Sequence, residues 1–229
     1  MEEPKVDQGK KQLAQRITQK LYQKYGEPHW RQPLPPLDEL ISTILSQNTN
    51  DGNRDRAFES LRQRFPTWEA VRDAPLAEVI DAIRTAGLAQ QKAPRIQAVL
   101  RAITEQRGRL DLDFLRERDA EEALRWLRQF KGVGPKTAAI VVLFSLNKPA
   151  FPVDTHIHRV TRRLGLIPNS ASAEQAHQLL GELFEASEYA SAHLNIIRLG
   201  REICQARKPK CPICPLQDEC AYYRRQDHR

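Results

Sequence analysis

The chain has 229 residues, of which 40% are hydrophobic and 28% charged, so it can bury one large core or two smaller ones. No apolar run approaches the roughly 18 residues that cross a bilayer, and the polar, mixed-charge start is not a secretory signal. We therefore expect a cytoplasmic protein with no membrane partner. The formal net charge of +7 is typical of a protein with a polyanionic partner, most commonly nucleic acid, although it could serve solubility alone.

Helical signals follow one another along the chain. Residues 11–25 carry apolar side chains at helical spacing and end before Gly26, and the proline-rich segment 31–36 predicts an extended connector. Further helices are predicted between proline and glycine breakers over 37–46, 51–65, 75–85, 91–106, 119–130, 135–146, 155–164, 173–186 and 187–204. Strand signals are weak, because the only Asp-Gly pair lacks alternating apolar flanks. The predicted fold class is all-α.

A glycine-bracketed turn, GVGPKTA, begins at Gly132. Its glycines permit positive φ, and Pro135 suits the first position of a helix. The turn therefore presents backbone N–H groups at a helix N-terminus, which favours binding of phosphate. A nucleotide-binding P-loop fits poorly, because Pro135 separates Gly134 from Lys136. A helix–turn–helix corner without a ligand remains an alternative.

An amine and a carboxylate lie at the starts of two successive predicted helices. Lys136 falls in the first turn of its helix, where the helix dipole favours the free amine that a nucleophile needs. Asp154 is placed to cap the next helix, and that position keeps a carboxylate ionised. A helix of about 18 Å followed by a segment that can span about 23 Å allows the chain to bring the two together. A surface lysine that only touches phosphate is the alternative for Lys136.

Three further residues near these helix starts are candidate DNA contacts or ligands. His156 and His158 lie at i and i+2, positions that do not face each other on a helix, so a shared metal ion is disfavoured. We interpret them as capping, packing or phosphate-contacting residues, and we place His156 among the candidate DNA contacts. Thr137, which follows Lys136 in the turn motif, is also a candidate DNA contact.

All the cysteines of the chain lie close together near its C-terminal end. They have the spacing C-x6-C-x2-C-x5-C, at Cys204, Cys211, Cys214 and Cys220. Four thiolates in so short a segment can close around one centre, and sulfur ligation suits either zinc or an iron–sulfur cluster. Two disulfides are disfavoured in the cytosol. The six-residue spacer is basic and could contact phosphate, or it could be an ordinary charged loop.

Taken together, GVGPKTA, VDTH and the cysteine spacing resemble the endonuclease III branch of helix-hairpin-helix DNA glycosylases, over residues 37–220. The resemblance implies a [4Fe-4S] cluster on the cysteines, which favours iron over zinc. It also implies two all-α lobes with DNA bound between them. One is a six-helix lobe that contains the hairpin, over 30–147, and the other combines 1–29 with 148–229 and carries the cluster.

The same resemblance implies roles for the amine and the carboxylate. Lys136 would attack C1′ of the sugar and form a Schiff base, and Asp154 would assist departure of the base. The Schiff base then permits β-elimination, which cuts the strand 3′ to the lesion. The implied partner is double-stranded DNA with an oxidised pyrimidine or an abasic site, and we expect a monomeric, nucleoid-associated protein.

Two more segments match the family pattern. In AGLAQQKA, Leu88 holds the place of the residue that wedges into the duplex, although it could equally be a packing residue. In ILSQNTND, Gln47 and Asn48 fall in the segment that fills the gap left by the flipped base. The family commonly has Gln where this chain has Asn48, so the way in which this segment recognises the opposite DNA strand stays open. A polar turn at a helix end is the alternative.

Three other functions are weighed against the bifunctional glycosylase. A monofunctional glycosylase for mismatched adenine, uracil or thymine usually lacks the lysine that this chain has. A non-catalytic DNA-binding module would need a broken Lys136–Asp154 pair. A redox or iron-sensing protein would need a flavin motif or a partner cysteine, which the sequence does not offer.

Overall fold

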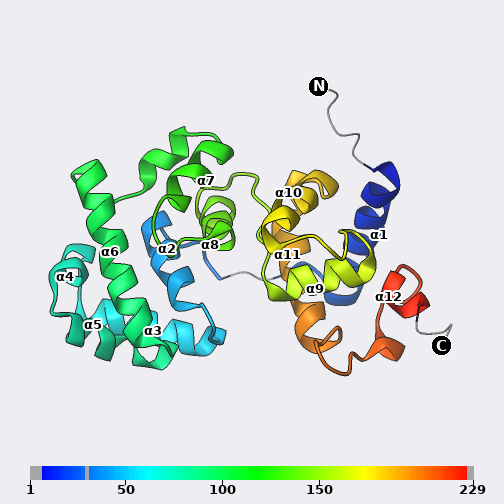
Figure 1. Ribbon diagram of the computed structural model, residues 1–229, viewed down its shortest axis with the longest axis horizontal. Coiled ribbons are helices and arrows are strands. Elements are labelled where there is room, and N and C mark those ends of the chain that lie inside the picture. The colour runs from blue at the N-terminus through cyan, green and yellow to red at the C-terminus, as the bar shows by residue number, and fades with distance from the viewer. Residues whose placement is uncertain (1–6, 29–30, 226–229) are drawn as a thin grey trace. The chain divides into compact units, whose positions relative to one another are not determined.

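The computed structural model describes residues 7–28 and 31–225, and in these ranges every regular element is a helix, which confirms the all-α prediction (Figure 1). The chain forms two compact units. We call Pro33–Lys148 the inserted unit, and Met1–Gln32 together with Pro149–Arg229 the terminal unit. None of the described helices combines the length and the apolar character of a membrane span.

The inserted unit is built around α2 and the long helix α6. Nine of the ten residues of α2 are buried, and α2 packs against α3, α6 and α8. α6 also packs against α4, α5 and η1. The elements are α2 (Pro36–Leu45), α3 (Asp51–Arg64), α4 (Trp68–Asp73), α5 (Leu76–Ala82), η1 (Arg84–Ala86), α6 (Ala89–Arg107), η2 (Asp113–Glu117), α7 (Ala120–Arg128), α8 (Pro135–Ile140) and η3 (Val141–Ser145).

The structure departs from the predicted helices of this unit in four places. The short helix η2 was not predicted, and the helix predicted over 75–85 is α5 followed by η1. The short helix α4 was not predicted, because its six residues are too few to show a period; it starts at Thr67, whose side chain accepts a hydrogen bond from Ala70 N. The helix predicted over 135–146 is α8 followed by one π-helical turn, Val141–Ser145. A continuous apolar run cannot reveal such a change of hydrogen-bond period.

The terminal unit joins the first helix of the chain to its last third. α1 packs against α10 and α11, and α9 packs against α11. Near the C-terminal end, Glu219 forms ion pairs with Arg16 and Lys20 of α1. The elements are α1 (Gln8–Tyr25), α9 (Thr155–Leu164), α10 (Ala173–Leu183), η4 (Ala186–Glu188), α11 (Tyr189–Glu202), η5 (Cys211–Ile213) and α12 (Ala221–Arg224).

Candidate functional site

The turn between α7 and α8 requires glycine at only one of its two glycine positions. Gly132 has φ +94°, and a Cβ there would lie 2.1 Å from Cδ of Arg95. Gly134 is extended, with φ −85° and ψ 177°, and a Cβ there would meet nothing within 4 Å. Gly132 alone therefore uses positive φ. No side chain caps α8, so Gly134 leaves the N-terminus of that helix uncovered.

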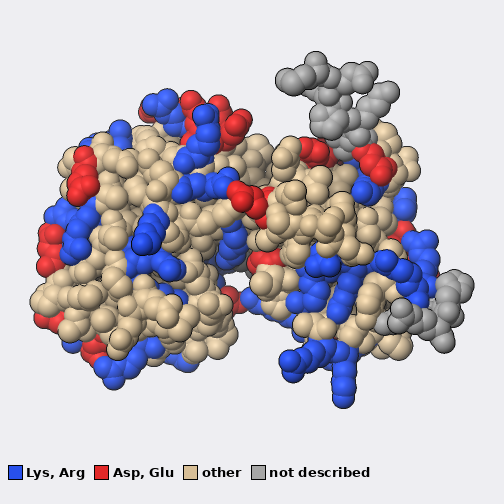
Figure 2. Space-filling model, in the orientation of Figure 1, with Lys and Arg blue, Asp and Glu red and all other residues tan. Residues whose placement is uncertain are grey.

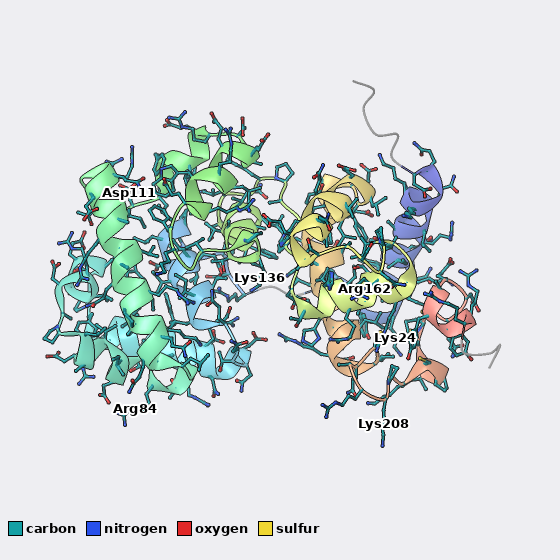
Figure 3. All side chains as sticks on the ribbon, viewed as in Figure 1. Lys24, Arg84, Asp111, Lys136, Arg162 and Lys208 are labelled. Atoms are coloured by element: carbon teal, nitrogen blue, oxygen red, sulfur yellow. The ribbon has the colours of Figure 1, made fainter. Side chains whose placement is uncertain are left out.

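Lys136 is the second residue of α8, and Figure 3 shows it at the start of that helix. Its side chain is half-buried, whereas the residues that follow it are packed into the core against α2 and α7. Thr137 is 3% exposed, so a DNA contact through its hydroxyl is not expected. The start of α8 is thus fixed by its packing, while the Lys136 side chain remains partly exposed.

Gln47 is held by side chains and backbone that are distant in sequence. Its Oε1 accepts a hydrogen bond from Arg95 Nη1 at 2.7 Å, and its Nε2 donates to the carbonyl of Gly132 at 3.4 Å. The neighbouring Asn48 is exposed and has φ +53°, a left-handed conformation that is uncommon outside glycine. Of the two residues predicted to enter the DNA, Gln47 is therefore anchored to the hairpin and Asn48 is open to solvent.

Substituting Gly132 by Ala is expected to destabilise the protein by about 2 kcal/mol, because alanine is strained at positive φ and its methyl group displaces the Arg95 side chain. Gly134→Ala is the matched control, since that position is extended and open, and it should cost no more than about 0.5 kcal/mol. Thermal unfolding followed by circular dichroism measures both. Equal stability of the two variants would contradict this account of the turn.

Leu88 lies in the loop between η1 and α6. It is 46% exposed and has φ +50°, and it follows Gly87, which has φ +66°. Its carbonyl accepts backbone hydrogen bonds from Gln91 and Lys92 in the first turn of α6. The packing alternative for Leu88 therefore does not fit, because its side chain stands out on a short, strained loop.

Lys92 is a buried lysine that the sequence reasoning missed. It is 2% exposed, and its Nζ donates hydrogen bonds to the carbonyls of Leu45 at 2.7 Å and Ala86 at 2.8 Å. Burial, with a smaller contribution from Arg95, lowers the pKa of Lys92 to about 8. Both bonds survive deprotonation, because a neutral amine retains two N–H donors. The sequence did contain a sign that Lys92 is buried. Lys92 lies four residues before Ile96 and therefore falls on the apolar face of α6.

Asp154 caps α9, as predicted. Its Oδ1 accepts a hydrogen bond from Ile157 N at 2.7 Å, and its carbonyl accepts one from His158 N at 2.9 Å. Gly165, with φ +87°, ends the helix. The cap fixes the backbone of Asp154 at the N-terminus of a helix that is packed against α11. Lys136 and Asp154 belong to different units, so their meeting remains a prediction.

The two histidines of α9 have separate partners. His156 Nδ1 lies 3.1 Å from Arg159 Nη2, and the ring packs against Gly200 of α11. His158 Nε2 lies 2.8 Å from the carbonyl of Ala171. Both imidazoles thus have packing or hydrogen-bond partners within the terminal unit, and a phosphate contact by His156 stays a prediction.

The four cysteines line a single cavity in the terminal unit, together with Arg163 and side chains of the C-terminal segment. Arg163 Nη1 donates a hydrogen bond to Cys204 Sγ at 3.3 Å and to the carbonyl of Gln205 at 2.7 Å. The backbone turns tightly at the next two cysteines, where Cys214 N donates to the carbonyl of Cys211 at 3.0 Å. The sequence spacing therefore predicts the grouping that the structure has.

The chemistry of this donor set fits a cluster of several metal ions. Burial raises the pKa of Cys211, and it raises that of Cys214 to about 11, so these thiols hold their protons until a cation replaces them. Four thiols that line one cavity are a donor set that fits an iron–sulfur cluster, and Cys204, Cys211, Cys214 and Cys220 would hold it.

A basic surface adjoins this cavity. Figure 2 shows Lys and Arg side chains gathered on the viewed face of the terminal unit, and Figure 3 labels Arg162 on α9 and Lys208 in the loop after α11. Arg207, Lys208 and Lys210 are all exposed in this loop. Positive charge spread over neighbouring elements of one face is the electrostatic pattern of a surface that binds phosphates.

Comparison with known proteins agrees with these features. The family model for HhH-GPD superfamily base excision DNA repair proteins matches residues 41–186, and the model for the iron–sulfur binding domain of endonuclease III matches residues 204–220. Endonuclease III of Thermotoga maritima is 32% identical over 214 residues, which are 93% of this chain and 95% of that protein. A candidate DNA glycosylase of Arabidopsis thaliana is 43% identical over 141 residues, which are 62% of this chain and 48% of the plant protein.

A solved structure extends the similarity to the fold. A non-covalent complex of endonuclease III with DNA superposes with a TM-score of 0.82 at 29% identity, over 96% of this chain and 99% of that one. The predicted resemblance is confirmed on the hairpin, the cysteine spacing and the fold. The chain therefore belongs to the endonuclease III family of HhH-GPD base excision DNA repair proteins, with an iron–sulfur binding segment at 204–220.

Proposed function

We propose that this protein is a bifunctional DNA glycosylase and AP lyase that removes oxidised pyrimidines from double-stranded DNA. The observation that carries the proposal is the place of Lys136, a half-buried amine at the uncapped start of α8, directly after the GVG turn. The family match at 41–186 includes both Lys136 and Asp154. The proposal includes a cytoplasmic, nucleoid-associated location, because the proposed substrate is DNA.

In the proposed reaction, Lys136 supplies the nucleophile. Its Nζ attacks C1′ of the damaged nucleotide, the bond between sugar and base breaks, and the base leaves. The lysine nitrogen loses its protons and the C1′–O4′ bond of the sugar ring opens, with O4′ taking up a proton, so that an imine forms at C1′. The imine withdraws electrons from the sugar, so that a proton is lost from C2′ and the 3′ phosphate departs. Covalent catalysis of this kind divides one difficult step into two easier ones.

Asp154 supplies the charge that this chemistry requires. The bond from Ile157 N fixes one carboxylate oxygen at the N-terminus of α9, where a negative charge interacts favourably with the helix dipole. An ionised carboxylate next to C1′ stabilises the positive charge that develops on the sugar as the base departs. The proposal thus brings Lys136 and Asp154, from two units, to the same sugar.

The damaged base must leave the stack before it can be attacked, which costs a few kcal/mol and costs least for a damaged base. We assign Leu88 as the wedge and Asn48 as the residue that fills the vacated space, because both are exposed at the tips of short loops. Gln47 supports the Asn48 segment through its own hydrogen bonds to Arg95 and the carbonyl of Gly132. His156 and the backbone of the hairpin remain proposed phosphate contacts.

The proposed cofactor is a [4Fe-4S] cluster held by Cys204, Cys211, Cys214 and Cys220. A bound cluster would give shape to the basic loop 204–220, in which few side chains are buried. Arg163, whose guanidinium donates to Cys204 Sγ, would offset part of the negative charge of the thiolates.

Borohydride trapping tests the proposed function directly. The reagent reduces a Schiff base to a stable amine, so wild-type protein should become covalently joined to duplexes that carry thymine glycol or an abasic site. Uracil in the same sequence context is the comparison substrate. Removal of the damaged base without trapping would point to a monofunctional glycosylase, and absence of both products would refute the proposal.

A further inference from the structure

Each of two exposed loops of the inserted unit contains a non-glycine residue with left-handed backbone. Asn48 follows α2 and has φ +53°, and Leu88 follows η1 and has φ +50°. Both side chains are exposed, and they belong to segments 40 residues apart in the sequence. Left-handed backbone is strained at leucine, whereas asparagine tolerates it, so the Leu88 loop in particular persists because its surroundings hold it in place.

Lys92 is bonded to the base of both loops. Its Nζ donates to the carbonyl of Leu45, the last residue of α2, at 2.7 Å, and to that of Ala86, the last residue of η1, at 2.8 Å. Its backbone N–H also donates to the carbonyl of Leu88 at 3.0 Å. One buried side chain thus joins the root of the loop that bears Asn48 to the root of the loop that bears Leu88.

We propose that Lys92 is a positioning residue that fixes the Asn48 loop and the Leu88 loop at one spacing, so that wedge and gap-filling residue enter the duplex together. This inference rests on the proposed function, because it concerns the opening of damaged DNA. Lys92 does not touch the substrate, since its side chain is 2% exposed. Lys92 acts on the two loops only through its hydrogen bonds to the carbonyls of Leu45 and Ala86.

The chemistry of this position favours positioning over simple stability. Burying an ammonium is unfavourable, so a lysine is not expected in a core that needs only apolar packing. An apolar residue in its place would leave two buried carbonyls without a donor, so the experiment needs a control that has the same loss of hydrogen bonds. What an apolar residue cannot do is hold two helix-end carbonyls at a set distance, because it has no donor.

The chain provides a matched control on the same helix. Gln97 is 3% exposed, and its Nε2 donates to the carbonyls of Val71 at 3.0 Å and Ala74 at 2.8 Å. It therefore has the burial and the number of backbone bonds that Lys92 has, but its partners lie in and after α4, away from both loops. Gln97→Met removes two buried hydrogen bonds without touching the segments that meet DNA.

The experiment compares Lys92→Met with Gln97→Met on two substrates. One is a duplex with thymine glycol, which must be opened, and the other is a single-stranded oligonucleotide with an abasic site, which needs neither wedge nor gap filling. For Lys92→Met we expect excision from the duplex to fall on the order of 10- to 100-fold, the scale of a misplacement of about 1 Å. Its strand cleavage on the single strand should stay within about threefold of wild type, since the nucleophile is unchanged.

Gln97→Met should leave the ratio of the two rates at its wild-type value. If Lys92→Met does not fold, Lys92→Gln replaces it, because its amide keeps the donors but is one bond shorter and cannot hold the two carbonyls at the wild-type distance; the same selective loss on the duplex is expected. Equal loss on both substrates, or the same ratio in the Lys92 and Gln97 variants, would overturn the inference and leave Lys92 a structural residue. Failure of the proposed function is distinguishable, because wild-type protein would then fail to cleave the abasic single strand, whatever the variants do on the duplex.

Discussion

Lys136→Gln is expected to abolish borohydride trapping on every substrate and to lower strand cleavage at abasic sites by about 10³-fold or more, because glutamine has no basic nitrogen to form an imine. The substitution is close in length and sits on a half-buried position at the start of α8. The free energy of unfolding should therefore change by no more than about 0.5 kcal/mol. Trapping gels and thermal unfolding of the same preparations give the two measurements.

Lys131→Gln is the control for Lys136. It removes an exposed lysine from the same turn, five residues earlier, and so matches the change in charge next to the DNA. Its trapping should remain at the wild-type level, apart from a modest loss of affinity that disappears at low salt. Normal trapping by Lys136→Gln would refute the assignment of the nucleophile, and equal losses in both variants would show that only positive charge is needed.

Cys214→Ser is expected to remove the visible absorbance of the purified protein and to leave the segment 204–225 open to proteolysis. The reason lies in the packing, since Leu216 is the only buried residue among 204–225. So small a core cannot hold a loop of this length, and the ligands of the proposed cluster must do so. Loss of a structural metal centre belongs to the large effects on stability, more than about 4 kcal/mol.

The matched substitution is Ile213→Ser, next to Cys214 in η5. Ile213 is 64% exposed, so its replacement by serine removes little buried surface and no thiol. Absorbance, limited proteolysis and thermal unfolding should all match wild type for this variant. A Cys214→Ser protein with full absorbance and a resistant C-terminal segment would show that the loop does not depend on a cluster held by four cysteines.

Sequence reasoning located the elements that have local signals. α9 begins and ends where predicted, because Asp154 caps its first turn and Gly165 adopts the left-handed conformation at its end. α4 was missed, since a helix of six residues displays no period. The π-helical turn after α8 was also missed, because four of its five residues are apolar and their hydrogen-bond spacing leaves no trace in the sequence.

In the candidate site, too, features with a local sequence pattern were predicted, and contacts between residues distant in the sequence were not. The lysine after the hairpin and the cysteine spacing are local patterns, and both were recognised. The bond from Arg95 to Gln47 joins residues 48 apart, and no pattern in one sequence pairs them. Lys92 was passed over because lysine is normally a surface residue, although its place on the apolar face of α6 was visible.

The terminal unit has a consequence for how the protein is made. α1 is synthesised first, yet it packs against α10 and α11, and Glu219 pairs with two of its basic side chains. The inserted unit, Pro33–Lys148, emerges whole from the ribosome before any of these partners. Domains fold as units during synthesis, so α1 must wait as an unpartnered amphipathic helix until α10 and α11 have been added. The four cysteines follow α11 in the chain, so an iron–sulfur centre can assemble only after the unit that bears Lys136 has been synthesised.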